Sequence, residues 1–256
     1  MITDKSGHYV YCITGARQER NWRAIGLDRT DVLSVTGDDL SMVVSSHPLT
    51  RLVVSAENMM AHAKVIQRVM QEFDSVLPVR FGTIAANAGE IRHLLDRRHQ
   101  KFLSLLGYMD HKIELDVKGL WSNMAPIYEE VVRENRSIEK AKTQTAKLPG
   151  AKYLQNRCQV GMMVQEALLK KKEREAKIVT DYFRNTAVDL KLNRTTSDEM
   201  FLNAAFLVDR GREKEFDNLM DRLCLRYRER AAFKYAGPLP VFNFVNVVIN
   251  SEQWQR

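Results

Sequence analysis

Short apolar runs separated by polar turns predict a series of strands in the first half of the chain. They span residues 8–13, 31–35, 40–45 and 76–81. Gly37, Asp38 and Asp39 stand between the second and third runs and favour a turn, so these two runs are expected to form a hairpin. The fourth run contains Pro78, which cannot donate a backbone hydrogen bond and therefore indicates an edge strand or a bulge.

Two other stretches of the first half have a helical period. In residues 56–73, with Ser55 as the expected N-cap, apolar side chains recur on one face at Met59, Ala63, Ile66, Met70 and Phe73. Asn87 and Glu90 resemble a capping box at the start of a second helix. Its apolar positions are Ile91, Leu94, Leu95, Phe102 and Leu106. Gly107 is the expected end of this helix.

The second half opens with a strand in which apolar and charged residues alternate over residues 113–117, so one face is expected to be buried and the other wet. Helices are expected over 123–146 and 151–190, separated by Leu148-Pro149-Gly150. Further strands are expected at 201–208, 231–235 and 244–249. Between the first two of these lies an amphipathic stripe formed by Phe216, Leu219, Met220, Leu223 and Tyr227.

These elements mix helices and strands without the regular alternation of a doubly wound sheet, which predicts an α+β fold. We place a domain boundary near Gly107, with an N-terminal α+β domain over 1–107 and a second α+β domain over 108–256. The second domain has a long helical insertion at about 123–194. A weak additional strand around residues 190–192 would complete the order βαββαβ, so the C-terminal domain is expected to be modified ferredoxin-like.

Composition narrows the class of protein. The chain has 256 residues, of which 45% are hydrophobic and 28% charged, as in a globular protein with a substantial core. The sequence has no apolar run near the ~20 residues of a membrane helix, and its first residues do not form a secretory signal. Cys12, Cys158 and Cys224 are odd in number and far apart, which predicts reduced thiols in a cytosolic protein and no disulfide framework.

The net charge of +7 is concentrated in the predicted helical insertion, which has 15 basic and 9 acidic residues between positions 123 and 194. Its densest part is Lys170-Lys171-Lys172. Glu166 and Lys170 form a favourable i,i+4 pair, as is typical of a solvated surface helix, and we favour this interpretation. The alternative is nucleic-acid binding, although few aromatic residues stand among the charges to stack on bases.

The usual motifs of catalysis and cofactor binding are absent from the sequence, including the phosphate-binding loop, the dinucleotide fingerprint, the zinc-binding helix and the nucleophile elbow. His93, Asp96 and His99 are expected in one helix, where the third residue turns away from the first two and the set forms a polar face. Cys12 is expected to pack inside its strand. We therefore assign no catalytic, cofactor-binding or metal-binding residue, and on these grounds alone the sequence does not indicate a function.

Six segments give a more specific indication. They are residues 9–13 (YVYCI), 76–83 (VLPVRFGT), 114–118 (ELDVK), 150–154 (GAKYL), 203–209 (NAAFLVD) and 235–240 (YAGPLP). In this order they resemble the boxes of the GvpF/GvpL gas vesicle protein family. The last box departs from the family pattern, because Leu239 stands for a Trp, Val241 for a Pro and Phe242 for a Tyr.

The resemblance implies a minor or accessory gas vesicle protein with two α+β domains and no enzymatic activity. It implies a partner, the hydrophobic main shell protein GvpA, with other gas vesicle accessory proteins as further candidates, and neither a membrane nor a cofactor is expected. It also implies a location at the gas vesicle shell, and in the cytoplasm during assembly. The alternative function is that of a nucleic-acid-binding accessory protein using the basic helical insertion.

Two expectations about particular residues follow. Within the second segment we expect Gly82 to serve backbone geometry and Arg80 to form an internal salt bridge, in preference to contacting a partner. For the insertion, we expect that reversing the charge of Lys170, Lys171 and Lys172 weakens partner capture at low salt and leaves the fold intact.

Overall fold

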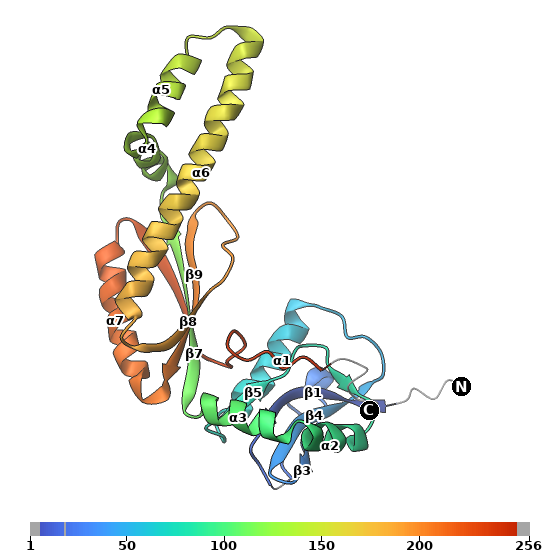
Figure 1. Cartoon of the computed structure of the whole chain (residues 1–256). Coiled ribbons are helices and arrows are strands. Elements are labelled where there is room, and N and C mark those ends of the chain that lie inside the picture. Colours follow the sequence, from blue (N-terminus) through green and yellow to red (C-terminus); the bar gives the residue numbers. More distant parts are fainter. Residues whose placement is uncertain (1–5, 18, 250–256) are drawn as a thin grey trace. The chain divides into compact units, whose positions relative to one another are not determined.

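The structure is a computed structural model of the chain, and it describes residues 6–17 and 19–249 (Figure 1). It mixes helices and strands, as the sequence predicts, and its described residues form two compact units. The first unit comprises the residues up to Glu114, Leu207–Gly211 and the residues from Gly237 onward. The second comprises Leu115–Phe206 and Arg212–Ala236. The division differs from the predicted 1–107 and 108–256 chiefly because the last stretch of the chain groups with the first unit.

The first unit is built on a sheet with the order β2-β3-β4-β1-β5, in which β6 also pairs with β1. The strands are β1 (Ser6–Thr14), β2 (Asn21–Arg23), β3 (Val32–Gly37), β4 (Leu40–Pro48), β5 (Val76–Pro78) and β6 (Ile84–Ala85). The predicted hairpin is confirmed, because Gly37 pairs with Leu40 across a turn in which Asp38 has a φ of 47°. Strand β5 ends the sheet order and stops at Pro78, as the proline indicates.

The helices of this unit are α1 (Ala56–Val69), α2 (Ala88–Arg97) and α3 (His99–Met109), with a 3₁₀ turn at Leu27–Arg29. Both predicted N-caps are confirmed: the Ser55 hydroxyl accepts from the Asn58 amide, and Asn87 accepts from the Glu90 amide. The single helix predicted after Asn87 is wrong. Arg98, with φ −110° and ψ 15°, separates α2 from α3, and α3 continues through Gly107 to Met109.

The buried face of α1 agrees with the predicted one in part, because Ile66 is buried and Met70 and Phe73 pack against the same cluster. His62, Val65, Ile66 and Val69 are buried, whereas Met59 is 51% exposed. His62 interrupts the apolar pattern of the buried stripe. The sequence therefore indicated a face rotated from it, on which Met59 and Ala63 are not buried. The side chain of Met59 is exposed to solvent as a result of this rotation.

Strand β1 separates two hydrophobic clusters within this unit. One cluster lies against α1 and contains Tyr9, Tyr11 and Cys12, and the other lies against α2 and α3 and contains Val10 and Ile13. A register shift between Val10 and Cys12 marks a bulge in this strand. Both faces of β1 are therefore covered, and Cys12 packs as predicted.

The strand predicted over residues 244–249 is wrong, although the burial behind it is real. Val245, Val247 and Ile249 are buried in the cluster under α2 and α3. Only an isolated parallel bridge, between Val79 and Val247, joins this segment to the first unit's sheet among the described residues. Alternating apolar residues here fill a core without joining a continuous ladder, because their partner strand β5 already ends at Pro78.

The second unit contains most of another sheet, with the order β10-β7-β9-β8. Its elements are β7 (Lys112–Trp121), α4 (Met124–Glu134), α5 (Arg136–Thr145), α6 (Gly150–Phe183), β8 (Ala187–Leu192), β9 (Met200–Asp209), a 3₁₀ turn at Arg210–Arg212, α7 (Glu213–Tyr227) and β10 (Ala231–Leu239). The weak strand expected at 190–192 is part of β8. Asn135 divides the helix expected over 123–146 into α4 and α5.

Helices α6 and α7 pack together through stacked aromatic rings. The Phe183 and Phe216 ring centroids are 4.4 Å apart, and both rings contact Phe206 of β9 at 5.2 Å. All buried residues of α6 lie from Leu168 onward. The second half of this helix therefore belongs to the core of the unit, and the first half extends beyond it (Figure 1).

The predicted wet face of β7 needs one correction. Glu114 is buried, and its carboxylate accepts from the backbone and side-chain amides of Asn243 at 2.8 and 2.7 Å. A buried carboxylate requires such partners to offset its lost hydration. The sequence alternation did not reveal this partner because Asn243 is 129 residues further along the chain.

Candidate functional site

The segment from β5 to β6 forms a sharply folded loop in the first unit. The Val79 amide donates to the Tyr11 carbonyl at 2.9 Å, and the Arg80 amide donates to the Val247 carbonyl at 3.2 Å. The Thr83 hydroxyl donates back to the Arg80 carbonyl at 2.7 Å. Between them Gly82 has a φ of 83°, which confirms the expectation that this glycine serves backbone geometry.

A buried hydrogen-bonded chain holds this loop against α1 and β1. The Gly82 amide donates to the Tyr9 hydroxyl at 3.2 Å, and the Tyr9 oxygen lies 2.8 Å from His62 Nδ1. His62 Nε2 lies 3.2 Å from the Val79 carbonyl, which can only accept. Nε2 therefore carries the proton and Nδ1 accepts from Tyr9. Burial lowers the pKa of His62 to about 4 and raises the pKa of Tyr9, so both groups are neutral at neutral pH.

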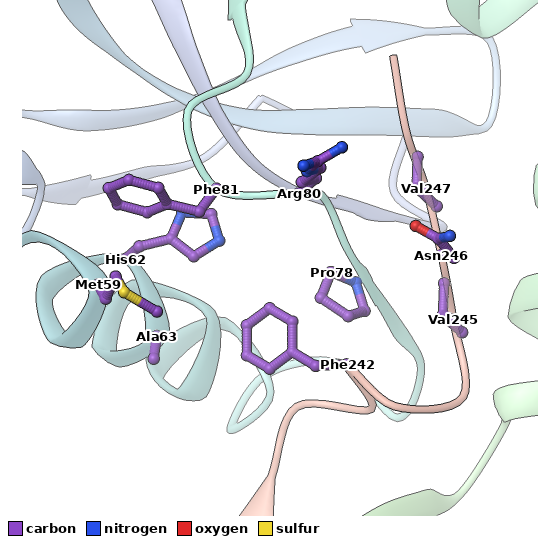
Figure 2. A pocket seen from close by; sticks show the side chains of 10 residues that line it. All are labelled: Met59, His62, Ala63, Pro78, Arg80, Phe81, Phe242, Val245, Asn246 and Val247. Carbon is purple, nitrogen blue, oxygen red and sulfur yellow. The ribbon is translucent and has the colours of Figure 1, made fainter. Parts of the chain in front are cut away.

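Next to this chain lies a cavity of about 340 Å³, which we call the box cavity (Figure 2). Figure 2 shows that side chains from α1, from the loop after β5 and from the C-terminal segment surround it. Its lining residues are Met59, His62, Ala63, Pro78, Arg80, Phe81, Phe242, Val245, Asn246 and Val247. The walls are predominantly apolar, and only three of these lining residues have polar side chains.

The surface around the box cavity is also rich in exposed apolar side chains. Met59, Met60 and Phe242 are exposed, as are Val53 and Val54 in the loop before α1. A second hollow, of about 440 Å³, adjoins the first through the shared residues Arg80 and Phe81, and it includes Val54. Exposed apolar groups that surround a concave apolar site are typical of a binding surface.

Arg80 gives this surface a positive charge. It is exposed, and within the described residues no carboxylate lies within 4 Å of its guanidinium, so the expected internal salt bridge is not formed there. Its backbone is fixed by the bonds to Val247 and Thr83. The side chain is therefore available at the edge of the box cavity.

Replacing Gly82 by alanine tests the backbone of this loop. A Cβ at Gly82 would meet no atom within 4 Å, so the positive φ alone should cost about 1–2 kcal/mol of unfolding free energy. Gly107 is the matched control, because it lies in α3 with equally open space. Gly107→Ala should stabilise the fold by up to about 1 kcal/mol. Urea unfolding of the two variants measures both effects, and equal shifts of the same sign would contradict this explanation.

The basic run of α6 is not a uniformly solvated face. Lys170 is exposed and pairs with Glu166 at 2.7 Å, as predicted. Lys171 is only 5% exposed, and its ammonium lies 2.9 Å from Glu130 and 2.7 Å from Glu134 of α4. Lys172, also buried, donates to the Ser197 carbonyl at 2.7 Å. These two lysines stabilise the unit internally, so the expectation that the triple charge reversal leaves the fold intact is corrected here.

The other polar candidates of the sequence do not converge. His93 lies in α2 and His99 begins α3, so they are not in one helix as predicted, and His99 pairs with Asp39 in the turn of the hairpin. Cys158 and Cys224 are free and exposed. Over residues 6–17 and 19–249, no group of three or more His, Cys, Asp or Glu side chains is arranged to hold a metal ion.

Sequence reasoning missed the centre of this site. Tyr9 lies 53 positions before His62 and 73 positions before Gly82 in the chain. Nothing in the sequence near His62 indicates its buried partners. The six segments did include Tyr9 and Gly82, so the family boxes were the available signal.

The fold and this surface define an α+β protein with a predominantly apolar cavity lined by α1, by Pro78 and the loop after β5, and by residues 242–247. The family model described as "Gas vesicle synthesis protein GvpL/GvpF" matches residues 7–246. The chain therefore belongs to the GvpL/GvpF family of gas vesicle proteins. Its role is accordingly related to gas vesicles, and its family is not one of known enzymes.

Relatives and solved structures agree with this membership. The chain is 25% identical to gas vesicle protein F of Dolichospermum flosaquae over 87% of this chain and 90% of that protein. It is 25% identical to gas vesicle protein F1 of Halobacterium salinarum, over 88% and 85%. The crystal structure of GvpF from Anabaena sp. PCC7120 shares the fold with a TM-score of 0.81 at 21% identity, covering 94% of this chain and 99% of that one. That of Microcystis aeruginosa GvpF has a TM-score of 0.78 at 20% identity, over 94% and 99%.

In the part of the chain that the structure describes, no helix combines the length and the apolar character that crossing a membrane requires.

Proposed function

We propose that this protein is an accessory factor of gas vesicle assembly that binds the main shell protein GvpA through the box cavity and its exposed apolar surroundings. The observation that supports this most directly is the exposure of Met59 and Phe242 in the lining of a concave apolar site, with the exposed Met60 next to Met59 in α1. We further propose that the protein acts without catalysis, at the shell and in the cytoplasm during assembly.

The physical reason is the solubility of the partner. A shell subunit that presents apolar surface to a gas space exposes that surface to water before assembly, and exposed apolar surface promotes aggregation. A partner that covers this surface stabilises the soluble complex by a free energy of about 25 cal/mol for each Å² of apolar surface removed from water. The flexible thioethers of Met59 and Met60 are suited to such contacts, because methionine adapts its shape to irregular apolar surfaces.

We also infer a modified ferredoxin-like arrangement for the sheet of the second unit. Its elements follow the order strand, helices, strand, strand, helix, strand, which is the ferredoxin-like order. The sheet order β10-β7-β9-β8 places the first and third of these strands at the centre. The three helices α4, α5 and α6 stand where that arrangement has a single crossover helix.

Co-expression with GvpA tests the proposed binding. The full chain should bring GvpA into the soluble fraction and retain it in an affinity pull-down. Met59→Glu combined with Met60→Glu should reduce the recovered GvpA at least ~10-fold, because a charged group would have to be buried in the interface.

Leu225→Glu is the control, since Leu225 is an exposed apolar residue of the second unit. It should leave recovery unchanged, and circular dichroism should show that all variants are folded. Equal recovery with the Met59/Met60 variant would exclude the box cavity as the docking surface. GvpA that stays insoluble beside the unaltered chain would exclude the proposed binding altogether.

The internal contacts of the basic run argue against the alternative function, which is nucleic-acid binding by the basic insertion. Lys171 and Lys172 are engaged within the protein, which removes two of the cations from the densest run. A nucleic-acid binder would show affinity that falls steeply with salt and no recovery of GvpA.

A further inference from the structure

Helix α5 and the first half of α6 form a helical hairpin with little burial of its own. None of residues 150–167 in α6 is buried, and within α5 only Ile138 and Thr145 are. Figure 1 shows α5 running beside this half of α6, with the connecting loop at the far end of the hairpin. Helices in proteins are stabilised mainly by packing an apolar face. This hairpin therefore keeps helix surface that a further structural element can cover.

A groove of about 430 Å³ lies between the two helices of this hairpin and α4. Tyr128 and Val132 enter it from α4, Ile138 from α5, and Tyr153, Val160 and Val164 from α6. Both tyrosine side chains are exposed and Ile138 forms part of the buried base. The groove therefore has an apolar floor contributed by three helices, which is the shape that accepts one face of a partner helix.

The hairpin around the groove is strongly cationic. Residues 136–165 contain six basic side chains and one acidic one, Glu139. The six are Arg136, Lys140, Lys142, Lys147, Lys152 and Arg157, all exposed. No carboxylate of residues 6–17 or 19–249 lies within 4 Å of any of them as an ion pair, in contrast to Lys170, Lys171 and Arg174 on the same α6. Lys142 and Arg157 line the groove itself.

We propose that this groove, here called the hairpin groove, binds an acidic amphipathic helix of a partner protein. The partner's apolar face would pack on Val132, Val160 and Val164, and its flanking carboxylates would pair with Lys142 and Arg157. This site is distinct from the box cavity, which lies in the other unit, and does not depend on what binds there.

The chemistry of the groove favours a helix over a nucleic acid. Charge complementarity requires an anionic partner, and unpaired cations at the edge of an apolar strip attract carboxylates at modest desolvation cost. A nucleic acid presents phosphates outside its bases and offers no continuous apolar ridge for an aliphatic floor. Valine and isoleucine side chains are instead matched by the leucine face of an amphipathic helix.

Binding of a designed peptide to the full chain tests the proposal. The probe is a fluorescein-labelled amphipathic helix about five turns long, with leucines on one face and glutamates flanking them. Fluorescence anisotropy at low salt should show saturable binding. A peptide with lysines in place of the glutamates should bind at least ~10-fold more weakly, as should a scrambled glutamate peptide without an apolar face.

Two pairs of variants then locate the site. Lys142→Glu with Arg157→Glu should lower the affinity for the glutamate peptide at least ~10-fold. Arg222→Glu with Arg226→Glu on α7 makes the same change in net charge and should lower that affinity far less. Val160→Glu should weaken binding, and Met162→Glu should not, since residues two apart on α6 point to different sides.

The opposite results would overturn the proposal. Equal effects of the two charge pairs would mean that net charge alone attracts the peptide. Equal binding of the scrambled peptide would mean that the apolar floor contributes nothing. A single-stranded RNA oligonucleotide that binds more tightly than the glutamate peptide, and loses affinity through Lys142 and Arg157, would assign the surface to nucleic acid.

Discussion

Replacing Lys171 by glutamate is expected to lower the free energy of unfolding by about 3 kcal/mol, because it removes a buried ammonium from an ion-pair cluster and adds a like charge beside two carboxylates. The Lys171 ammonium joins Glu130 and Glu134 of α4 to α6. Glu130 also accepts from both terminal nitrogens of Arg230, at 2.8 and 2.9 Å. The bond to Arg230 is the largest cause of the lowered pKa of Glu130 and remains in the variant, so the Glu130 carboxylate would repel the new one at neutral pH.

Lys170→Glu is the matched control for this prediction. It changes the charge by the same amount one position earlier, on a side chain that is 68% exposed. Its urea midpoint should stay closer to that of the parent than the midpoint of Lys171→Glu does. If the two variants unfold at the same midpoint, the Lys171 cluster does not contribute to stability as described. A partner-capture test should for this reason use Lys170 alone from this run.

The second large effect is a loss of stability in mild acid that depends on His62. Its pKa is about 4 in the folded state, below the 6.5 of an unperturbed histidine in an unfolded chain. Above pH 6.5 both states are neutral, and as pH falls through this window the unfolded state binds the proton first. The stability present at higher pH is therefore lost on acidification, by about 2 kcal/mol between about pH 7.5 and about pH 5 from this group alone.

His62→Gln isolates this contribution. A glutamine amide can donate to the Val79 carbonyl and accept from Tyr9, but it does not titrate. Urea unfolding of the parent and the variant should show a difference in unfolding free energy that shrinks by about 2 kcal/mol over the same pH range. Glu130 does not affect this comparison. A carboxyl with a lowered pKa loses its stabilising contribution only as pH falls below the range of about 5 to 7.5 used for His62. A difference that stays constant with pH would mean that folding does not lower the pKa of His62, and a difference that grows on acidification would mean that folding raises it.

Much of the local structure could be predicted because it depends on neighbours a few residues apart. The Ser55 and Asn87 caps, the turn at Asp38 and the edge position of Pro78 all follow from such short-range chemistry. The strand expected at 190–192 was only partly correct, because α6 ends at Phe183 and β8 begins at Ala187, within the stretch that was predicted to be helical. Where α2 ends and α3 begins was not predictable, since Arg98 is not a breaker of helices by its own propensity.

The candidate site was harder to predict, since its groups come from distant parts of the chain. The box cavity combines α1, the loop after β5 and residues 242–247. The sequence pattern correctly indicated that residues 244–249 are apolar and alternating, but period alone could not distinguish a strand from a core-filling segment. Likewise Met59 lies in an apolar pattern and was assigned to the core, and its exposure follows from the burial of His62 instead.

By itself, the sequence determined the α+β class, most strands and helices, their caps and turns, and the membership of the GvpL/GvpF family. Tertiary structure alone decided which face of α1 is buried, that Lys171 pairs with α4 and that Glu114 pairs with Asn243. The physical reason is range. Propensity and capping act within a helical turn, whereas burial and ion pairing depend on which distant groups the fold brings within a few ångströms.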